Sequence, residues 1–127
     1  MSFKLKTSLS STTPCTEYFY GTEGESFIYG EALTLSEGKL TKCTGTTKPV
    51  FISLGDVSCK DSKTFVPVMR VFDFYIFTCP LTGDADGLNA GDAVTIDSDG
   101  CGVTSQTSGG IAEIVEIGEN TVSVRFQ

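Results

Sequence analysis

One phrase occurs twice in this chain and limits what it can fold into. Residues 30–35 read Gly-Glu-Ala-Leu-Thr-Leu and residues 91–96 read Gly-Asp-Ala-Val-Thr-Ile, at an offset of 91 − 30 = 61. Aliphatic residues that alternate with threonine have the period of a strand with one buried face. Each copy is followed by an acid–glycine turn, and such turns suit tight hairpins. The pattern predicts two copies of one β-hairpin unit with its return strand, over 30–54 and 91–114. The alternative is that a sequence common at the start of β-strands occurs twice by chance.

The rest of the chain favours β structure as well. Its 127 residues are most simply one domain. No stretch has the 3.6-residue period of an amphipathic helix, and the most apolar segment, 64–78, is rich in β-branched and aromatic residues. A terminal hairpin is legible at 111–117 and 121–126. We therefore expect an all-β protein, a single compact β-barrel or sandwich built from two related hairpin units, with no helix longer than two turns.

The first 26 residues differ in character from the rest. They are polar and rich in serine and threonine, with aromatic side chains set between. Such sequence buries little area to offset the entropy cost of ordering it. We predict an N-terminal arm, 1–26, before a β-barrel-like domain, 27–127, that folds without it. The arm either packs along the domain or orders on a partner, through candidate interface residues Phe3, Tyr18, Phe19 and Tyr20.

The sequence holds no recognisable catalytic or metal-binding pattern. It has no histidine, which is the commonest general base and zinc ligand. The acidic pieces at 84–87 and 97–100 read Asp-x-Asp-Gly, but Ala93 and Gln106 stand where a calcium loop needs its glutamate. Turn chemistry explains both pieces. We expect a non-enzyme, with no catalytic, cofactor-binding or metal residues and no cofactor.

The net charge limits the class of binding partner, and the cysteines indicate the redox compartment. A net charge of −7 disfavours nucleic acid and anionic membranes as partners, because both attract clustered lysine and arginine.

An odd number of cysteines and the lack of an export signal at the start favour free thiols and synthesis in the cytoplasm. The cysteines are Cys15, Cys43, Cys59, Cys79 and Cys101. Cys43 and Cys101 fall at nearly equivalent places in the two repeats and could approach one another, although small buried side chains are the simpler reading.

The layout of residues 30–126 resembles small tailed-phage capsid decoration, or cement, proteins. The resemblance lies in the Gly-acid-Ala-aliphatic-Thr-aliphatic phrase repeated about sixty residues later, in Val-Pro-Val at 66–68, and in the terminal strand 121–126. It implies a polar arm before a compact β-barrel or tulip-shaped domain. It also implies a homo-oligomer, with a trimer favoured, and no catalytic residues. The chain departs from that pattern in its number of cysteines and in the aromatic segment 72–77.

The function implied is that of a virion structural protein, made in the host cytoplasm and placed on the capsid exterior. It would decorate and stabilise an icosahedral phage capsid by binding the outer surface of major capsid subunits, because a partner that binds only the assembled shell stabilises it. The alternative is a small non-catalytic β-barrel module that binds a carbohydrate or small ligand, on a fibre or in a bacterial cell. Exposed aromatic patches on the N-terminal segment favour the first function, whereas a deep aromatic pocket favours the second.

Overall fold

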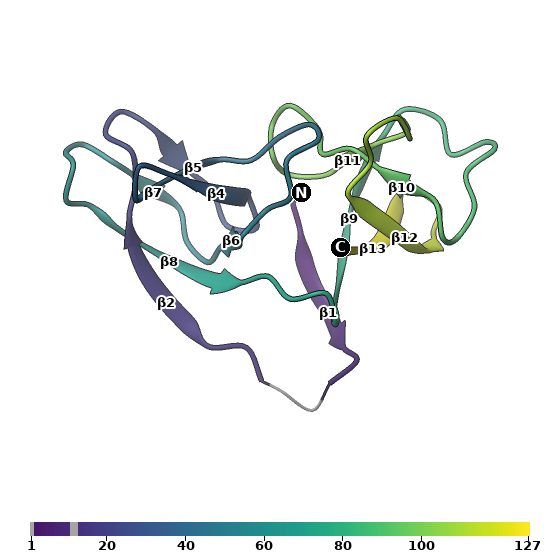
Figure 1. Cartoon of the computed structure of the whole chain (residues 1–127), viewed down its shortest axis with the longest axis horizontal. Coiled ribbons are helices and arrows are strands. Elements are labelled where there is room, and N and C mark those ends of the chain that lie inside the picture. Colours follow the sequence, from purple (N-terminus) through teal and green to yellow (C-terminus); the bar gives the residue numbers. More distant parts are fainter. Residues whose placement is uncertain (1, 11–12) are drawn as a thin grey trace.

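The computed structural model describes residues 2–10 and 13–127 and confirms an all-β protein (Figure 1). The strands, in chain order, are β1 Lys4–Ser8, β2 Thr16–Tyr20, β3 Ser26–Phe27, β4 Ala32–Ser36, β5 Lys39–Lys42, β6 Phe51–Ser53, β7 Val57–Ser58, β8 Phe65–Arg70, β9 Tyr75–Thr82, β10 Ala93–Val94, β11 Val103–Thr104, β12 Ala112–Ile117 and β13 Thr121–Phe126. Figure 1 shows two lobes, with β1 running between them beside β9.

The first lobe, which we call the first unit, comprises residues 16–70. Its sheet has the order β2-β8-β6-β4-β5, and the short pair β3–β7 lies in its loops. Val66 and Val68 of β8 point inward and are fully buried, while Phe65, the first residue of the strand, is 55% exposed. The period of two along β8 thus separates a core face from an outer face. The core of this unit is formed by Phe27, Leu33, Leu40, Phe51, Cys59, Val66 and Val68.

The second unit comprises residues 75–126. Its sheet has the order β9-β13-β12-β10, with β11 parallel to the far end of β9 and β1 added to the edge of β9. Its core is larger and includes Phe77, Val124 and Phe126 together with Ala32, Ile52 and Met69 of the first unit. The segment around Ile52 is apolar on both alternating faces because Phe51 lies in one core and Ile52 in the other.

The two units have the same ladder of paired strands. Adding 61 to both members of the pair Ala32↔Ile52 gives Ala93↔Glu113, which is the observed β10–β12 pair. The β6–β8 pair Phe51↔Arg70 corresponds to Ala112↔Phe126, since 51 + 61 = 112 and 70 + 56 = 126. The β2–β8 pair Tyr18↔Pro67 corresponds to Thr78↔Ser123, since 18 + 60 = 78 and 67 + 56 = 123. The equivalence therefore extends beyond 30–54 and 91–114 to strands that share no visible sequence pattern.

Each unit also closes on itself in the same way. The hairpin pair Leu35↔Leu40 corresponds to the bridge Ile96↔Val103, with a turn two residues longer in the second unit because 35 + 61 = 96 and 40 + 63 = 103. Gly21 then forms a parallel bridge with Leu40, and its counterpart Leu81 pairs in parallel with Val103. This parallel pairing joins the end of β2 to β5 in the first unit and β9 to β11 in the second. Among the described residues, each unit is thus a closed ring of strands.

The repeated phrase has the same structural role in both units. Gly30 and Gly91 have φ of 84° and 99°, a region that favours glycine. The N–H of Gly30 donates to the carbonyl of Ser53 at 2.7 Å, and that of Gly91 donates to the carbonyl of Ile114 at 2.8 Å. The glycine thus starts the strand with a turn that only a residue lacking Cβ adopts easily.

The acid that follows the glycine caps this turn. Glu31 Oε1 accepts a hydrogen bond from the N–H of Ile28 at 3.3 Å, and Asp92 Oδ2 accepts one from the N–H of Asn89 at 2.9 Å. Glu31 is buried, and its Oε2 has no hydrogen-bond partner among the described residues. Burial raises the pKa of the Glu31 carboxyl above its ordinary value, partly opposed by the hydrogen bond from Ile28.

The segment predicted as an N-terminal arm, 1–26, is built into both sheets over its described residues. β1 pairs antiparallel with β9, and β2 is the first strand of the first unit. Phe3 is 1% exposed and packs edge-on against Phe77 and Phe126 in the larger core. Main-chain hydrogen bonds and aromatic contacts, among them those of Phe3, hold a segment whose polar side chains are mostly exposed, which is why its composition did not indicate a strand.

Direct backbone contacts join the two units. Gly45 and Ile96 exchange both hydrogen bonds at 2.9 Å, and the N–H of Ala32 donates to the carbonyl of Gly100 at 2.8 Å. The N–H of Phe3 donates to the carbonyl of Gly30 at 3.0 Å. The first repeated phrase therefore touches both the second unit and the start of the chain.

Substituting alanine at the two equivalent glycines should separate backbone strain from crowding. Both variants should lose about 1–2 kcal/mol of unfolding free energy from the unfavourable φ. At Gly30 a Cβ would also lie 2.2 Å from Ser2 Oγ and 2.7 Å from the Phe3 carbonyl, whereas at Gly91 it meets nothing within 4 Å. Gly30→Ala should therefore cost about 1 kcal/mol or more beyond Gly91→Ala in urea unfolding. Equal losses would contradict the packing of residues 2–3 on Gly30.

Truncating Phe3 tests whether the start of the chain belongs to the core. Phe3→Ala should lower the unfolding free energy by about 3–5 kcal/mol because it removes a fully buried ring. Leu9→Ala is the matched control, since Leu9 is 61% exposed and its loss should change stability by less than about 0.5 kcal/mol. A neutral Phe3→Ala in thermal or urea unfolding would instead support a detachable arm.

Candidate interaction surface

The predicted interface residues fall in two different environments. Phe3 lies in the core and is not available to a partner. Tyr18 is 62% exposed, whereas Phe19 and Tyr20 are half-buried. Phe19 packs on Phe51 with ring centroids 4.7 Å apart. The structure therefore leaves Tyr18 and part of Tyr20 at the surface.

An aromatic strip, defined here as Tyr18, Tyr20 and Phe65, covers the outer face of the β2–β8 pair. Tyr18 and Tyr20 are two apart on β2, and Tyr20 lies opposite Phe65 of β8. The Tyr20 and Phe65 rings stack at 4.4 Å, and Phe65 is 55% exposed. Lys39 Nζ lies 4.8 Å from the Tyr20 ring centroid, which adds a cation–π contact. Exposed aromatic rings that neighbouring side chains hold in place are typical of interaction surfaces.

The sequence did not indicate Phe65 as part of this surface. It begins the most apolar run of the chain, where central burial was expected. The sequence alternation along β8 does indicate that Phe65 and Pro67 share one face of the strand and Val66 and Val68 the other. Only the pairing of β8 with β2 decides which of these faces is exposed.

A charged pair, Glu17 and Arg70, lies on the opposite face of the β2–β8 pair from the strip, because Glu17 and Tyr18 are consecutive residues of β2. The Arg70 guanidinium donates two hydrogen bonds to Glu17, at 3.0 and 2.9 Å, and lies 4.9 Å from the Phe51 ring centroid. The hydrogen bond from Arg70 lowers the pKa of the Glu17 carboxyl below its ordinary value. Because the two groups satisfy one another, neither is a free charge aimed at a substrate.

A hollow of about 290 Å³ opens next to this pair. It is lined by Thr13, Cys15, Glu17, Arg70, Phe72 and Tyr75. Phe72 is 41% exposed and stacks on Phe74 at 5.1 Å, while Tyr75 is buried. The hollow lies beside β2 and reaches the aromatic segment that connects the two units.

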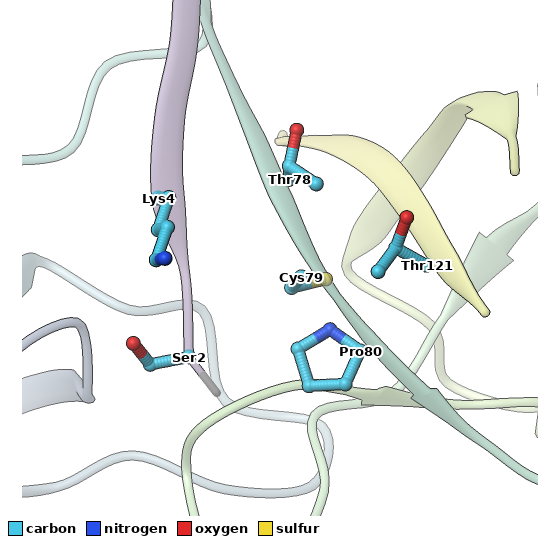
Figure 2. A pocket seen from close by; sticks show the side chains of 6 residues that line it. All are labelled: Ser2, Lys4, Thr78, Cys79, Pro80 and Thr121. Carbon is cyan, nitrogen blue, oxygen red and sulfur yellow. The ribbon is translucent and has the colours of Figure 1, made fainter.

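A smaller cavity, of about 140 Å³, lies where β1 meets β9. Figure 2 shows Ser2 and Lys4 on the β1 side, facing Thr78, Cys79 and Pro80 of β9, with Thr121 beyond them. Its volume is below the 300–1,000 Å³ that ligand pockets usually have. We therefore read it as the gap between two strands that are paired only over part of β9.

A third depression, of about 530 Å³, lies between the loops at 80–86 and 118–121. Its lining includes Asp84, Asp86 and Glu119. Asp84 Oδ1 accepts a hydrogen bond from the N–H of Asp86 at 2.9 Å, which is a turn contact. Within the described part of the chain, no group of three or more acidic, cysteine or histidine side chains is arranged to hold a metal ion.

All five cysteines lie in the described residues, and each is a free thiol. Cys15 is exposed and the other four are buried. Burial raises the pKa of Cys43 and Cys101 to about 11 and that of Cys79 to about 12. Cys43 Sγ donates to the carbonyl of Thr47, and Cys101 Sγ to the carbonyl of Asp99, so the two thiols are bonded to different loops.

Among residues 2–10 and 13–127, no helix is long and apolar enough to cross a membrane. No family model matches the chain, and comparisons with curated proteins and with solved structures also gave no match.

Thiol reactivity should distinguish Cys15 from the other cysteines. In the native protein at pH 8, an aromatic disulfide reagent should react rapidly with one thiol, because Cys15 is exposed and the other four cysteines are buried. Full unfolding in denaturant should release all five. The Cys15→Ser variant is the control and should abolish the rapid phase. Two or more rapid thiols in the native wild type would contradict the described burial.

Proposed function

We propose that this protein decorates a phage capsid by binding the outer surface of major capsid subunits, as a homo-oligomer on the virion exterior. The observation that carries the proposal is the exposed aromatic strip on the outer face of the β2–β8 pair. Aromatic anchors supply large contact area at low entropy cost and dominate the energetics of many interfaces. The resemblance of the repeated phrase to cement proteins indicates the class of partner.

The arrangement of the strip suits a flat protein partner better than a small ligand. Tyr18 and Phe65 project from a sheet face, and no described cavity encloses them. The hollow that contains aromatic side chains has its two charged groups bonded to each other. A carbohydrate-binding module would instead need unpaired polar groups converging beside an aromatic ring. We therefore favour the structural function over the small-ligand module.

The proposal makes a direct binding prediction. The protein should co-sediment with expanded phage capsids and should not bind free major capsid subunits. Replacing Tyr18 and Phe65 together by alanine should weaken occupancy at least tenfold, about 1.4 kcal/mol, with the melting temperature nearly unchanged. Tyr29→Ala is the matched control, because Tyr29 is 52% exposed but lies outside the strip.

Two results would count against the proposal. If wild-type protein fails to sediment with capsids, the partner is wrong. If the double variant binds as well as wild type, attachment does not use the aromatic strip.

A further inference from the structure

Within residues 2–10 and 13–127, the outer edge of β2 has no strand beside it over most of its length. β2 ends its sheet and pairs with β8 on one side only. On the other side, β5 reaches it only at the bridge between Gly21 and Leu40. Among the described residues, no strand pairs with the outer edge of Thr16–Tyr18. An unpaired edge offers backbone donors and acceptors to another chain.

The direction of the backbone groups on this edge follows from the ladder. The carbonyl of Pro67 accepts a hydrogen bond from the N–H of Leu54, so Pro67 faces β6 and turns away from β2. Tyr18 lies opposite Pro67, and residues opposite one another in an antiparallel pair either both face each other or both face away. The N–H and carbonyl of Tyr18 therefore point outward. Gly21 donates to the carbonyl of Thr64, which gives the same alternation along β2.

The second unit contains the same edge with a strand on it. Thr78 of β9 corresponds to Tyr18, since 18 + 60 = 78, and Thr78 pairs with Lys4 of β1. β1 continues along this edge to the pair Ser8↔Tyr75. By the same offset, residues 75–78 correspond to 15–18 of the first unit. The described residues thus place an antiparallel strand on one copy of the edge and none on the other.

We propose that the edge of residues 15–18 binds an extended, lysine-bearing segment of a protein partner, which adds antiparallel to β2 as β1 adds to β9. Main-chain hydrogen bonds to the outward groups of Thr16 and Tyr18 supply the common part of the binding. Tyr18 and the hollow beside Cys15 and Arg70 flank the edge and contact the side chains of the added strand.

Two observations favour this occupant over a second copy of the chain. β1, which occupies the equivalent edge, carries Lys4 and Lys6, and the whole chain has a net charge of −7. Complementary charge favours a cationic segment at this edge over the same edge of a second, equally acidic copy. In addition, the bridge from Gly21 to Leu40 limits the open edge to a few residues, which suits a single strand end.

The test uses the full chain and a synthetic peptide of residues 2–9, Ser-Phe-Lys-Leu-Lys-Thr-Ser-Leu, as the probe. The isotope-labelled protein is titrated with this peptide and followed by amide nuclear magnetic resonance. We expect saturable shifts at residues 15–18 and slowed hydrogen exchange at the N–H groups of Thr16 and Tyr18. These N–H groups should be protected because they become donors to the added strand.

Methylated peptides supply a matched pair of controls. The N–H of Phe3 points away from β9 toward Gly30, so the next N–H along, that of Lys4, points at the edge and that of Leu5 points away. A peptide N-methylated at Lys4 should bind at least tenfold more weakly than the parent peptide. A peptide N-methylated at Leu5 should bind nearly as well.

The same edge can be blocked from the protein side. Tyr18→Pro removes an outward N–H and leaves the bonds to β8 in place, a position that an edge strand tolerates. It should abolish peptide binding, whereas Tyr18→Val, which keeps the N–H, should retain it. Because the peptide assay needs no capsid, its result is independent of the function proposed above. If Tyr18→Pro does not fold, the methylated peptides still decide the matter.

Three results would overturn the inference. The first is an absence of shifts at residues 15–18 at millimolar peptide. The second is shifts confined to residues 75–78, which would mean that the peptide only exchanges with β1. The third is protection of Thr16 and Tyr18 that rises with protein concentration in the absence of peptide, which would identify a second copy as the occupant.

Discussion

The structure depends on where the backbone hydrogen bonds at the strand edges go. A strand that ends a sheet leaves a row of donors and acceptors that must find partners or face water. In each unit a parallel pairing removes part of that edge: Gly21↔Leu40 links the end of β2 to β5, and Leu81↔Val103 links β9 to β11. A closed ring of short strands can therefore enclose a core that an open sheet of the same strands would leave exposed to solvent.

The two units differ in how the remaining edge is treated. In the second unit β1 covers residues 75–78 of β9, and Phe3 fixes it by filling a place between Phe77 and Phe126. In the first unit, no strand in the described part of the chain pairs with the equivalent edge, residues 15–18, and the adjoining outer face carries Tyr18 and Phe65. At this place a partner can form main-chain hydrogen bonds to the exposed edge and can also bury apolar area against the exposed aromatic rings. The asymmetry between otherwise equal units thus marks the surface most suited to a partner.

Part of this arrangement was predictable from particular residues. The repeated Gly-acid-Ala sequence indicated equivalent hairpins. In both copies the glycine, Gly30 or Gly91, forms the turn before the strand. The acid that follows, Glu31 or Asp92, accepts a hydrogen bond that caps this turn. Tyr18 was a candidate interface residue and is exposed. Phe3 was a candidate of the same kind and lies in the core, since aromatic composition alone does not say whether a ring is covered by its own chain or by another.

The sequence by itself determined the local structure: the β class, the repeated turn, and the alternation that separates the faces of β8, because these depend on φ preferences and on the period of side chains along a strand. Only the tertiary structure decided which strands are neighbours. The match between β2 and β9 and between β8 and β13 leaves no pattern in the residues, because backbone pairing is indifferent to side-chain identity. For the same reason, the covering of β9 by β1 and the bare edge of β2 could be read only once the chain was folded.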